Sequence, residues 1–324
     1  MNVIIVHKFA GNMTINFEQR HADQIKKHVE NVYWFETAEE LIASGVDGEV
    51  MCSTGINQLA EIADWCVNSK RLKWFNSFLA GVDAVVGSEI GKLPITITNS
   101  SGIHGKQIAF HTIGLVAAHY RKFYTYFENQ KAHKWIKYPD MYDPEGKTLG
   151  VIGAGSIGID VAKFARGCGF ETIGVRRSGE ALEGFDRMYS NADIDKALSL
   201  MDVIVLLVPL TAQSRHIMNA DRFKALKKGA FLVNVARGGV LDHNALIDAL
   251  NNGTLAGCAL DANDPEPLPP ESPLWDMPNV IITPHCSGTS TRYMDRATKL
   301  LCENIDNFKK GLPLFNVIDV SDLA

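Results

Sequence analysis

Residues 150–158 read GVIGAGSIG, and this stretch decides the fold of the chain. Gly153, Gly155 and Gly158 form G-x-G-x-x-G between a β-rich run and a segment, 156–168, of helical periodicity. In that setting the first glycine permits a tight turn, the second lets the backbone approach a pyrophosphate, and the third lets helix and strand pack closely. Unpartnered N–H groups at a helix start also favour an anion. The expected cofactor contacts are Gly153, Gly155, Ser156, Ile157 and Gly158.

Two arginines follow the next expected strand, in IGVRRSGE at 173–180. Sheets of this kind that bind NAD usually carry an acid there, which accepts hydrogen bonds from the ribose hydroxyls. Arg176 stands 18 residues after Gly158, followed by Arg177 and Ser178. Guanidinium groups and a hydroxyl suit a 2′-phosphate, which a carboxylate would repel. We therefore expect NADP(H) as the preferred cofactor, with NAD(H) as an alternative and solvated loop-tip arginines as the simpler explanation.

Length and charge limit the kinds of partner. A chain of 324 residues exceeds the usual single domain, so two domains are expected. Its net charge of −5, without long basic runs, argues against nucleic-acid and membrane-surface binding. The longest apolar run, 203–208, is too short to span a bilayer, and no basic segment precedes an apolar stretch at the start. The expected location is cytoplasmic, and the expected partner is a small molecule.

The six cysteines show neither C-x-x-C spacing nor the density of a disulfide scaffold, so reduced thiols are expected. There is also no H-E-x-x-H motif and no clustered cysteine and histidine spacing of the kind that zinc sites use. The sequence therefore predicts no metal site.

Strand and helix signals alternate along most of the chain, which is typical of parallel sheets covered by helices. The first series has strands expected at 2–6, 48–53, 72–77 and 95–100, with helices at 17–29 and 57–67. The second has six expected strands, at 148–153, 171–175, 203–208, 229–235, 258–262 and 279–284, with helices at 156–168 and 244–251.

Two further helices set the domain boundaries. Turn residues lead into a long helix after about residue 105, and an amphipathic helix over 289–310 leaves the second series. We expect residues 1–99 and 290–324 to form a discontinuous substrate or catalytic domain around a dinucleotide-binding domain, 100–289. The predicted fold class is α/β, with two Rossmann-like parallel-sheet domains, one flavodoxin-like and one doubly wound, and an active-site cleft between them.

Three residues that can move a proton and bind an acid follow successive strands. Arg237 lies in NVARGGVLD, Glu266 in ALDANDPEPLPP and His285 in IITPHCSG, each near the carboxyl end of a parallel strand, where open sheets bind ligands. A 2-oxo acid needs a cation for its carboxylate and carbonyl, and a proton donor when hydride arrives. Arg237 suits the first task and His285 the second, with Glu266 orienting the imidazole.

Four segments together resemble the NAD(P)-dependent D-2-hydroxyacid dehydrogenase family. They read GVIGAGSIG, LLVPLTAQSRHIMN, NVARGGVLDHNALIDALNNGTLAGCALDANDPEPLP and VIITPHCSG, and the earlier NSFLAGVDAVV resembles the family's substrate loop. The arginine pair points to an NADP-preferring branch similar to glyoxylate/hydroxypyruvate reductases. The resemblance implies reversible reduction of a 2-oxo acid to a D-2-hydroxy acid, and it identifies Arg237, Glu266 and His285 with the catalytic trio.

Further site residues are implied by the resemblance alone. The backbone N–H groups of Ala80 and Gly81, beside Leu79, would hold the substrate carboxylate; Asp261 would face the nicotinamide carboxamide, and Pro209 would line the cofactor cleft. The family also implies a homodimer through the helix after residue 105, with Trp135 as a candidate to reach the partner's active site.

Some positions depart from the family's pattern or leave alternatives open. Phe110 stands where many members of the family have Glu, and Asn263 stands where an aromatic residue is common. Cys286 lies beside His285 and is interpreted as a packing residue. Phe78 and Leu79 suggest an apolar substrate wall, although core packing would look the same, so the identity of the 2-oxo acid stays open. The alternative functions are an NAD(P)-sensing, corepressor-like regulator of the same fold and a formate- or phosphite-oxidising relative.

Overall fold

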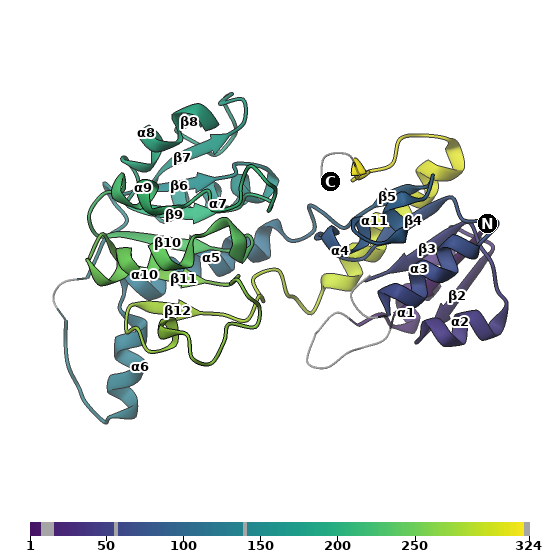
Figure 1. Ribbon diagram of the computed structural model, residues 1–324, viewed down its shortest axis with the longest axis horizontal. Helices are drawn as coiled ribbons and strands as arrows, with labels where there is room; N and C mark the ends of the chain where they lie inside the picture. Colours follow the sequence, from purple (N-terminus) through teal and green to yellow (C-terminus); the bar gives the residue numbers. More distant parts are fainter. Residues whose placement is uncertain (8–15, 55–57, 139–140, 321–324) are drawn as a thin grey trace. The chain divides into compact units, whose positions relative to one another are not determined.

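The computed structural model describes residues 1–7, 16–54, 58–138 and 141–320. The chain divides into two compact units (Figure 1). Unit 1 comprises Met1–His104 and Thr289–Ala324, and unit 2 comprises Gly105–Gly288. The sequence prediction placed these boundaries at 99/100 and 289/290. Each unit contains one parallel sheet with its own cores, so each is described by itself.

Unit 1 is built on a five-stranded parallel sheet in the order β2-β1-β3-β4-β5, which is the flavodoxin-like order. Along β1, Val3 and Ile5 enter one core while Ile4 and Val6 enter the other. Both faces of the sheet are therefore buried, which explains the continuous apolar run NVIIV. The strands are β1 (Asn2–Val6), β2 (Asn31–Phe35), β3 (Val50–Ser53), β4 (Trp74–Ser77) and β5 (Thr96–Thr98).

Helices from both ends of the chain cover this sheet. One core joins Ala22 and Ile25 of α1 to Leu301 and Ile305 of α11, so the last helix belongs to the first unit. The other core contains residues of α2 and α3. The helices of unit 1 are α1 (Gln19–Ile25), α2 (Ala38–Ser44), α3 (Leu59–Asn68), α4 (Asp83–Val86), the short 3₁₀ turn η1 (Glu89–Lys92) and α11 (Tyr293–Lys310).

Unit 2 contains a seven-stranded parallel sheet in the order β12-β11-β10-β9-β6-β7-β8. Counted from β6, this is the doubly wound order 3-2-1-4-5-6 with one strand added after the sixth, and the direction of winding reverses between β6 and β9. Ligands bind at such a reversal, beyond the carboxyl ends of the strands. The strands are β6 (Thr148–Ile152), β7 (Glu171–Arg176), β8 (Arg187–Ser190), β9 (Val203–Leu206), β10 (Ala230–Asn234), β11 (Leu255–Leu260) and β12 (Val280–Ile282).

Two sets of helices cover the two faces of this sheet. The core on one face contains residues of α5 and α7, and the core on the other contains residues of α8, α9 and α10. Helix α6 has no buried residue and extends away from the sheet of its unit (Figure 1). The elements are α5 (Gly105–Tyr120), α6 (Phe123–Lys131), α7 (Ser156–Gly167), η2 (Asn191–Asp193), α8 (Ile194–Leu198), α9 (Ala220–Lys224), η3 (Gly238–Val240), α10 (His243–Asn251) and η4 (Pro273–Trp275).

Unit 2 has one strand more than the six expected from its sequence. The additional strand, β8, reads RMYS and pairs with β7 at the edge of the sheet. Its residues are exposed or only half-buried, so it lacks the apolar run that marked the other strands. β2, at the edge of the first sheet, was not predicted either, although it reads NVYWF; its residues too are exposed or half-buried. The confirmed α/β class thus rests on the central strands, whose faces are both buried.

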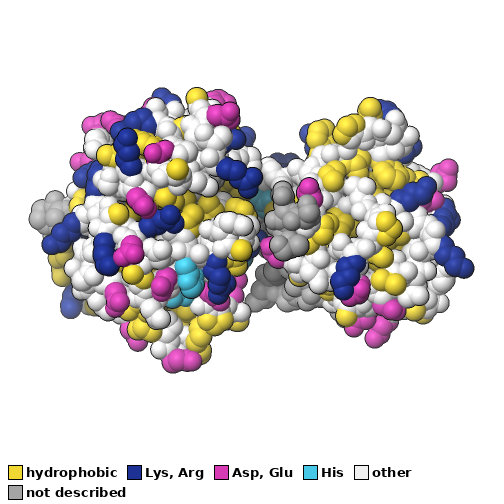
Figure 2. Space-filling model, turned by 45° about the horizontal axis from the view of Figure 1, so that its top comes forward, with side chains coloured by type: hydrophobic (Ala, Val, Ile, Leu, Met, Phe, Trp, Pro, Cys, Tyr) yellow, Lys and Arg dark blue, Asp and Glu magenta, His cyan; other side chains and the backbone are white. Residues whose placement is uncertain are grey.

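No helix in the described part of the chain is long and apolar enough to cross a membrane. On the face shown in Figure 2, lysine and arginine side chains are interspersed with aspartate and glutamate.

Candidate functional site

The glycine-rich turn joins β6 to α7 at the point where the sheet's winding reverses. Gly153 has a φ of +94°, and a Cβ atom there would lie 2.7 Å from backbone atoms of Leu207 and Val208. Backbone conformation and close approach both require glycine at this position. The turn packs against the segment that directly follows β9, and the Gly153 N–H group donates to the carbonyl of Val175 in β7.

The other two glycines of the motif differ in what surrounds them. A Cβ atom on Gly155, the residue that caps α7, would meet no atom within 4 Å, so the backbone is open to a ligand there. A Cβ atom on Gly158 would lie 3.3 Å from the Val151 side chain, so this glycine lets α7 pack closely on β6. Ser156 is exposed and Ile157 half-buried at the first turn of α7. This arrangement can hold a dinucleotide pyrophosphate.

Arg176 is the last residue of β7, and Arg177 and Ser178 follow it in an exposed turn. Gly179 has a φ of +68°, and a Cβ atom there would lie 2.8 Å from the backbone nitrogen of Ser190, so the turn packs against the end of β8. The Ser178 hydroxyl donates to Glu180 Oε2 at 3.1 Å. The sequence analysis did not consider Glu180, which places one carboxylate in this otherwise cationic turn.

His285 and Glu266 meet beyond the carboxyl ends of β12 and β11. The distance between His285 Nδ1 and Glu266 Oε2 is 2.9 Å, and Glu266 Oε1 accepts a hydrogen bond from the Asn263 backbone nitrogen at 3.0 Å. Their side chains are 47% and 39% exposed, so Nδ1 is held while the ring stays open to a ligand. His285 has a φ of +50°, a conformation that costs a non-glycine residue about 1–3 kcal/mol and is concentrated at functional sites.

Arg237 begins the turn after β10 and is half-buried, with Nη1 donating to the Ala236 carbonyl at 2.8 Å. The fully buried Asn234 connects this turn to the next one, because its Nδ2 donates to the carbonyls of Arg237 and Ala262 at 3.0 and 3.1 Å. A Cβ atom on Gly238 would lie 1.9 Å from the Asn263 carbonyl. The two turns therefore lie in direct contact, and Asn234 is a positioning residue that the sequence analysis missed.

Asp261 directly follows β11 and is only 1% exposed. Its Oδ1 accepts hydrogen bonds from the Thr283 hydroxyl at 2.6 Å and the Cys286 backbone nitrogen at 2.9 Å, and its Oδ2 accepts one from the Ser287 nitrogen at 2.9 Å. Burial alone would raise the pKa of this carboxyl, but these hydrogen bonds outweigh burial and keep the pKa below its usual value. Asp261 is therefore ionised at neutral pH, and it anchors the segment that carries His285.

In unit 1 the segment after β4 is shaped by its neighbours. The carbonyl of Phe78 accepts a hydrogen bond from the Tyr293 hydroxyl at 2.7 Å, and Asn99 Nδ2 donates to the Ala80 carbonyl at 2.6 Å. Within the described residues, no acceptor is present for the N–H groups of Ala80 and Gly81. Phe78 is fully buried in the core, so the suggestion that it forms a substrate wall is wrong; Leu79 is half-buried and packs against the same core.

The remaining sequence-predicted residues lie in different surroundings. Pro209 is exposed after β9, Trp135 is 93% exposed, and Phe110 is exposed on α5 with its ring 6.5 Å from that of Phe164. Asn263 is buried, and its side-chain oxygen has no hydrogen-bond partner among the residues that the structure describes. Cys286 is half-buried beside His111, a neighbour that is distant in sequence and was therefore missed.

Comparison with known proteins agrees with the geometry of unit 2. Residues 113–287 match the family model described as D-isomer specific 2-hydroxyacid dehydrogenase, NAD binding domain. A glyoxylate reductase of Thermofilum pendens is 31% identical over 287 residues, covering 86% of this chain and 83% of the relative. A glycerate dehydrogenase of Methylorubrum extorquens is 30% identical over 295 residues, covering 87% of this chain and 89% of the relative.

A solved structure extends the likeness to both units. The NADPH-dependent glyoxylate/hydroxypyruvate reductase of Sinorhizobium meliloti, in complex with NADP and sulfate, matches with a TM-score of 0.81 and 27% identity, covering 100% of this chain and 99% of the other. The family model, the relatives and the parallel-sheet architecture agree. The chain therefore belongs to the D-isomer specific 2-hydroxyacid dehydrogenase family of oxidoreductases, and residues 113–287 are its NAD-binding domain.

Proposed function

We propose that this enzyme reduces a 2-oxo acid to a D-2-hydroxy acid with NADPH, in a reversible reaction. The observation that carries the proposal is the hydrogen bond between His285 and Glu266 at the carboxyl end of the NAD-binding sheet. It leaves an imidazole with one nitrogen held by a carboxylate and the other available for proton transfer. The relatives named glyoxylate reductase and glycerate dehydrogenase act on acids of this class by name.

In the proposed mechanism His285 is the general acid. Glu266 accepts a hydrogen bond from Nδ1, which orients the ring so that Nε2 can protonate the substrate's carbonyl oxygen. When bound, the nicotinamide supplies the hydride to the carbonyl carbon. In the reverse direction neutral His285 takes the hydroxyl proton back. Glu266 acts through the imidazole and is a positioning residue.

Binding of the acid is assigned to Arg237 and to the N–H groups of Ala80 and Gly81. The guanidinium of Arg237 can bind the carboxylate and polarise the carbonyl, which develops negative charge in the transition state. The N–H groups of Ala80 and Gly81 lack acceptors within the described residues and suit one carboxylate oxygen each. Leu79 would contact the substrate's side chain, while Asp261 and Pro209 would contact the nicotinamide end of the cofactor.

The cofactor preference is assigned to Arg176, Arg177 and Ser178 at the end of β7. The Sinorhizobium meliloti reductase was crystallised with NADP, and a family member of Xanthobacter autotrophicus, 26% identical with a TM-score of 0.80, was crystallised with NADPH and MES. A 2′-phosphate would accept charge-assisted hydrogen bonds from the two guanidinium groups. It would also compete with Glu180 for the Ser178 hydroxyl.

Replacing Arg176 and Arg177 by Asp and Ser, respectively, is expected to lower the ratio of kcat/KM for NADPH to that for NADH by about 10- to 100-fold, the effect of removing charge-assisted hydrogen bonds. The ratio is measured from initial rates at saturating oxo acid. Arg187→Ser is the matched control, because Arg187 lies at the amino end of the adjacent β8 and pairs with Glu171. An unchanged ratio in the double variant would show that the pair does not contact the cofactor.

The proposed function is tested by initial rates of NADPH and NADH oxidation with glyoxylate, hydroxypyruvate, pyruvate, and branched and aromatic 2-oxo acids. Turnover with a preference for NADPH supports the proposed reaction and cofactor. The size of the best substrate's side chain then indicates how much space lies beside Leu79. Tight cofactor binding without turnover of any acid would contradict it and favour the nucleotide-sensing alternative. The chirality of the product, assayed with an enzyme specific for one enantiomer, tests the D assignment.

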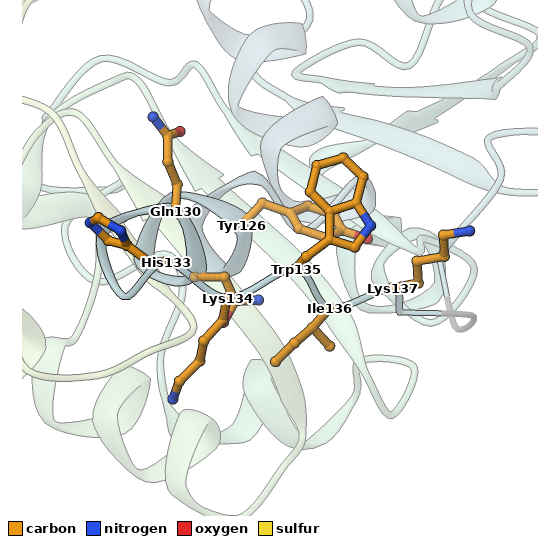
Figure 3. A pocket seen from close by; sticks show the side chains of 8 residues that line it. Tyr126, Gln130, His133, Lys134, Trp135, Ile136 and Lys137 are labelled. Carbon is orange, nitrogen blue, oxygen red and sulfur yellow. The ribbon is translucent and has the colours of Figure 1, made fainter.

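We further propose that α5 and α6 contact a second copy of the chain in a homodimer. Phe110, Phe123, Phe127 and Trp135 expose large apolar surfaces there, which is unusual for a free surface. Trp135 and Ile136 line an open hollow of about 600 Å³ with polar residues of α6 and the segment after it (Figure 3). Sedimentation of the wild type should give twice the monomer mass, and Trp135→Ala tests whether this tryptophan also supports activity.

A further inference from the structure

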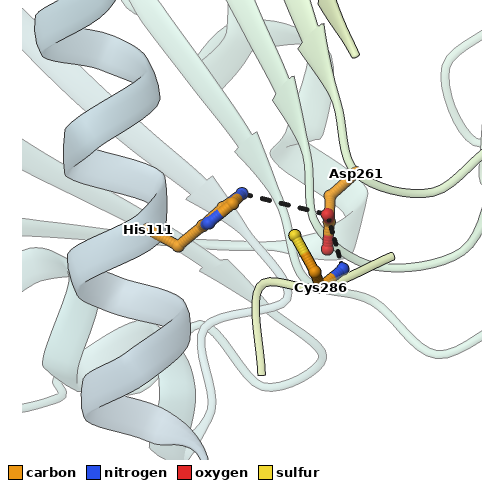
Figure 4. Close-up of side chains that lie close together, drawn as sticks. All are labelled: His111, Asp261 and Cys286. Carbon is orange, nitrogen blue, oxygen red and sulfur yellow. Dashed lines mark hydrogen bonds and ion pairs between the residues drawn. The ribbon is translucent and has the colours of Figure 1, made fainter. Parts of the chain in front are cut away.

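Unit 2 brings together three side chains of different chemistry that are distant in sequence. His111 lies on α5, Asp261 directly follows β11, and Cys286 follows β12 (Figure 4). One ligand atom from each, the imidazole nitrogen, the carboxylate oxygen and the thiol sulfur, lies within 4.8 Å of the other two. We call these three residues the His–Asp–Cys cluster.

Hydrogen bonds already hold two of these ligands in place. His111 Nε2 lies 3.2 Å from Thr283 Oγ1 and 3.8 Å from Asp261 Oδ1. Because the Thr283 hydroxyl donates to Asp261, His111 donates to Thr283 through Nε2. The backbone nitrogen of Cys286 donates to the same carboxylate oxygen, which draws the thiol toward it. Asp261 is thus the centre around which the other two ligands are arranged.

We propose that the His–Asp–Cys cluster binds a thiophilic divalent cation of the Zn²⁺ type. In a tetrahedral zinc site with bond lengths of about 2.0–2.3 Å, neighbouring ligand atoms are separated by roughly 3.3–3.8 Å. The 3.8 Å between His111 Nε2 and Asp261 Oδ1 is about 0.5 Å longer than the spacing of a nitrogen–oxygen pair, and the sulfur needs to move by about 1.3 Å at most to complete the site. Three protein ligands leave the fourth position for water or another ligand.

The charge balance of the cluster suits a divalent cation. Binding replaces the proton of the Cys286 thiol, which leaves to solvent, so that a thiolate and the Asp261 carboxylate neutralise the two positive charges while His111 stays neutral. Coordination shifts the His111 proton from Nε2 to Nδ1 and ends its hydrogen bond to Thr283.

An ion can reach the His–Asp–Cys cluster from solvent, whereas the thiols of most other cysteines are buried. The His111 side chain is 22% exposed, and Cys286 is half-buried. Cys52, Cys66, Cys258 and Cys302 are buried, and Cys168 is exposed. Cys168 therefore offers a matched control thiol on the same unit.

Cadmium ion is the probe, because its bond to a thiolate gives a charge-transfer absorption in the ultraviolet that is independent of enzyme activity. The full chain without cofactor, titrated with Cd²⁺, is expected to bind one equivalent with this absorption, and Zn²⁺ should displace it. Cys286→Ser should remove the absorption, His111→Ala should weaken binding at least 10-fold, and Cys168→Ser should change neither. Thermal unfolding of each variant shows whether it is folded, and Cys286→Ala replaces Cys286→Ser if the latter is not.

Absorption that persists in folded Cys286→Ser, or that is lost in Cys168→Ser, would overturn the proposal. So would equal Cd²⁺ affinity in wild type and folded His111→Ala. A further consequence rests on the proposed function: because Cys286 adjoins His285 and Asp261 is assigned to the cofactor, Zn²⁺ should inhibit wild-type turnover more strongly than that of Cys286→Ser. Cation binding without inhibition would contradict the proposed contact of Asp261 with the cofactor. The proposal of a cation site would still stand.

Discussion

His285→Ala is expected to lower kcat by about 10²- to 10⁴-fold, which is the usual contribution of a positioned general acid. The His285 imidazole contacts the Glu266 side chain beside β12, at the edge of the sheet. The glycine-rich turn follows β6, in the middle of the sheet. The dissociation constant for NADPH should therefore change little. Steady-state rates with the best 2-oxo acid, together with cofactor titration by fluorescence, measure the two effects separately.

Glu266→Gln is the matched variant for this test. It keeps the size of the side chain but removes the carboxylate that holds Nδ1, so its kcat should fall less than that of His285→Ala, while KM for the oxo acid changes little. A purely structural role for Glu266 would lower the thermal midpoint and leave kcat unchanged. Turnover by His285→Ala at the wild-type rate would remove His285 from the mechanism.

Arg237→Ala is expected to raise KM for the oxo acid and to lower kcat by about 10²- to 10³-fold, comparable to the loss of one donor to a developing oxyanion. Both constants should change, because the same charge would bind the carboxylate and stabilise the transition state. The turn itself should survive, since Asn234 holds it through the backbone carbonyl of residue 237 rather than through its side chain. Initial rates over a range of acid concentrations separate the two constants.

Arg237→Lys separates charge from shape. Lysine keeps the positive charge but lacks the planar fork that binds two oxygens, so this variant should recover only part of the activity lost in Arg237→Ala. Full recovery would show that charge alone is needed. A change in NADPH affinity with unaltered kcat and KM for the acid would place Arg237 at the cofactor instead of the substrate.

Much of the NAD-binding unit could be predicted from its local sequence, for reasons visible at single residues. Gly153 is required by a positive φ and by backbone atoms 2.7 Å from where a Cβ atom would lie, and such a constraint leaves a mark in the sequence. Central strands such as β9 and β10 are buried on every residue, so they appear as apolar runs. Edge strands β2 and β8 are both partly exposed; β8 reads RMYS and has no such run, whereas β2 reads NVYWF and was missed despite its apolar residues.

The candidate site could be predicted only as a set of positions. Arg237, Glu266 and His285 each follow a strand, and parallel strands bring their carboxyl ends to one edge, so their neighbourhood was foreseeable. The 2.9 Å contact between His285 and Glu266 depends on the length and path of two turns. Phe78 shows the same limit: its place in the core instead of a pocket follows from the packing of β4 against α11.

The sequence by itself determined the two parallel-sheet folds, the dinucleotide turn and the residue types available for chemistry, because glycine geometry and apolar periodicity act over a few neighbouring residues. The tertiary structure alone decided that Asn234 holds the Arg237 turn, that Phe78 lies in the core of unit 1, and that Cys286 meets His111 beside Asp261. These contacts join segments far apart in the chain. They depend on strand order and on the packing of helices against the sheets, and no short stretch of sequence specifies either.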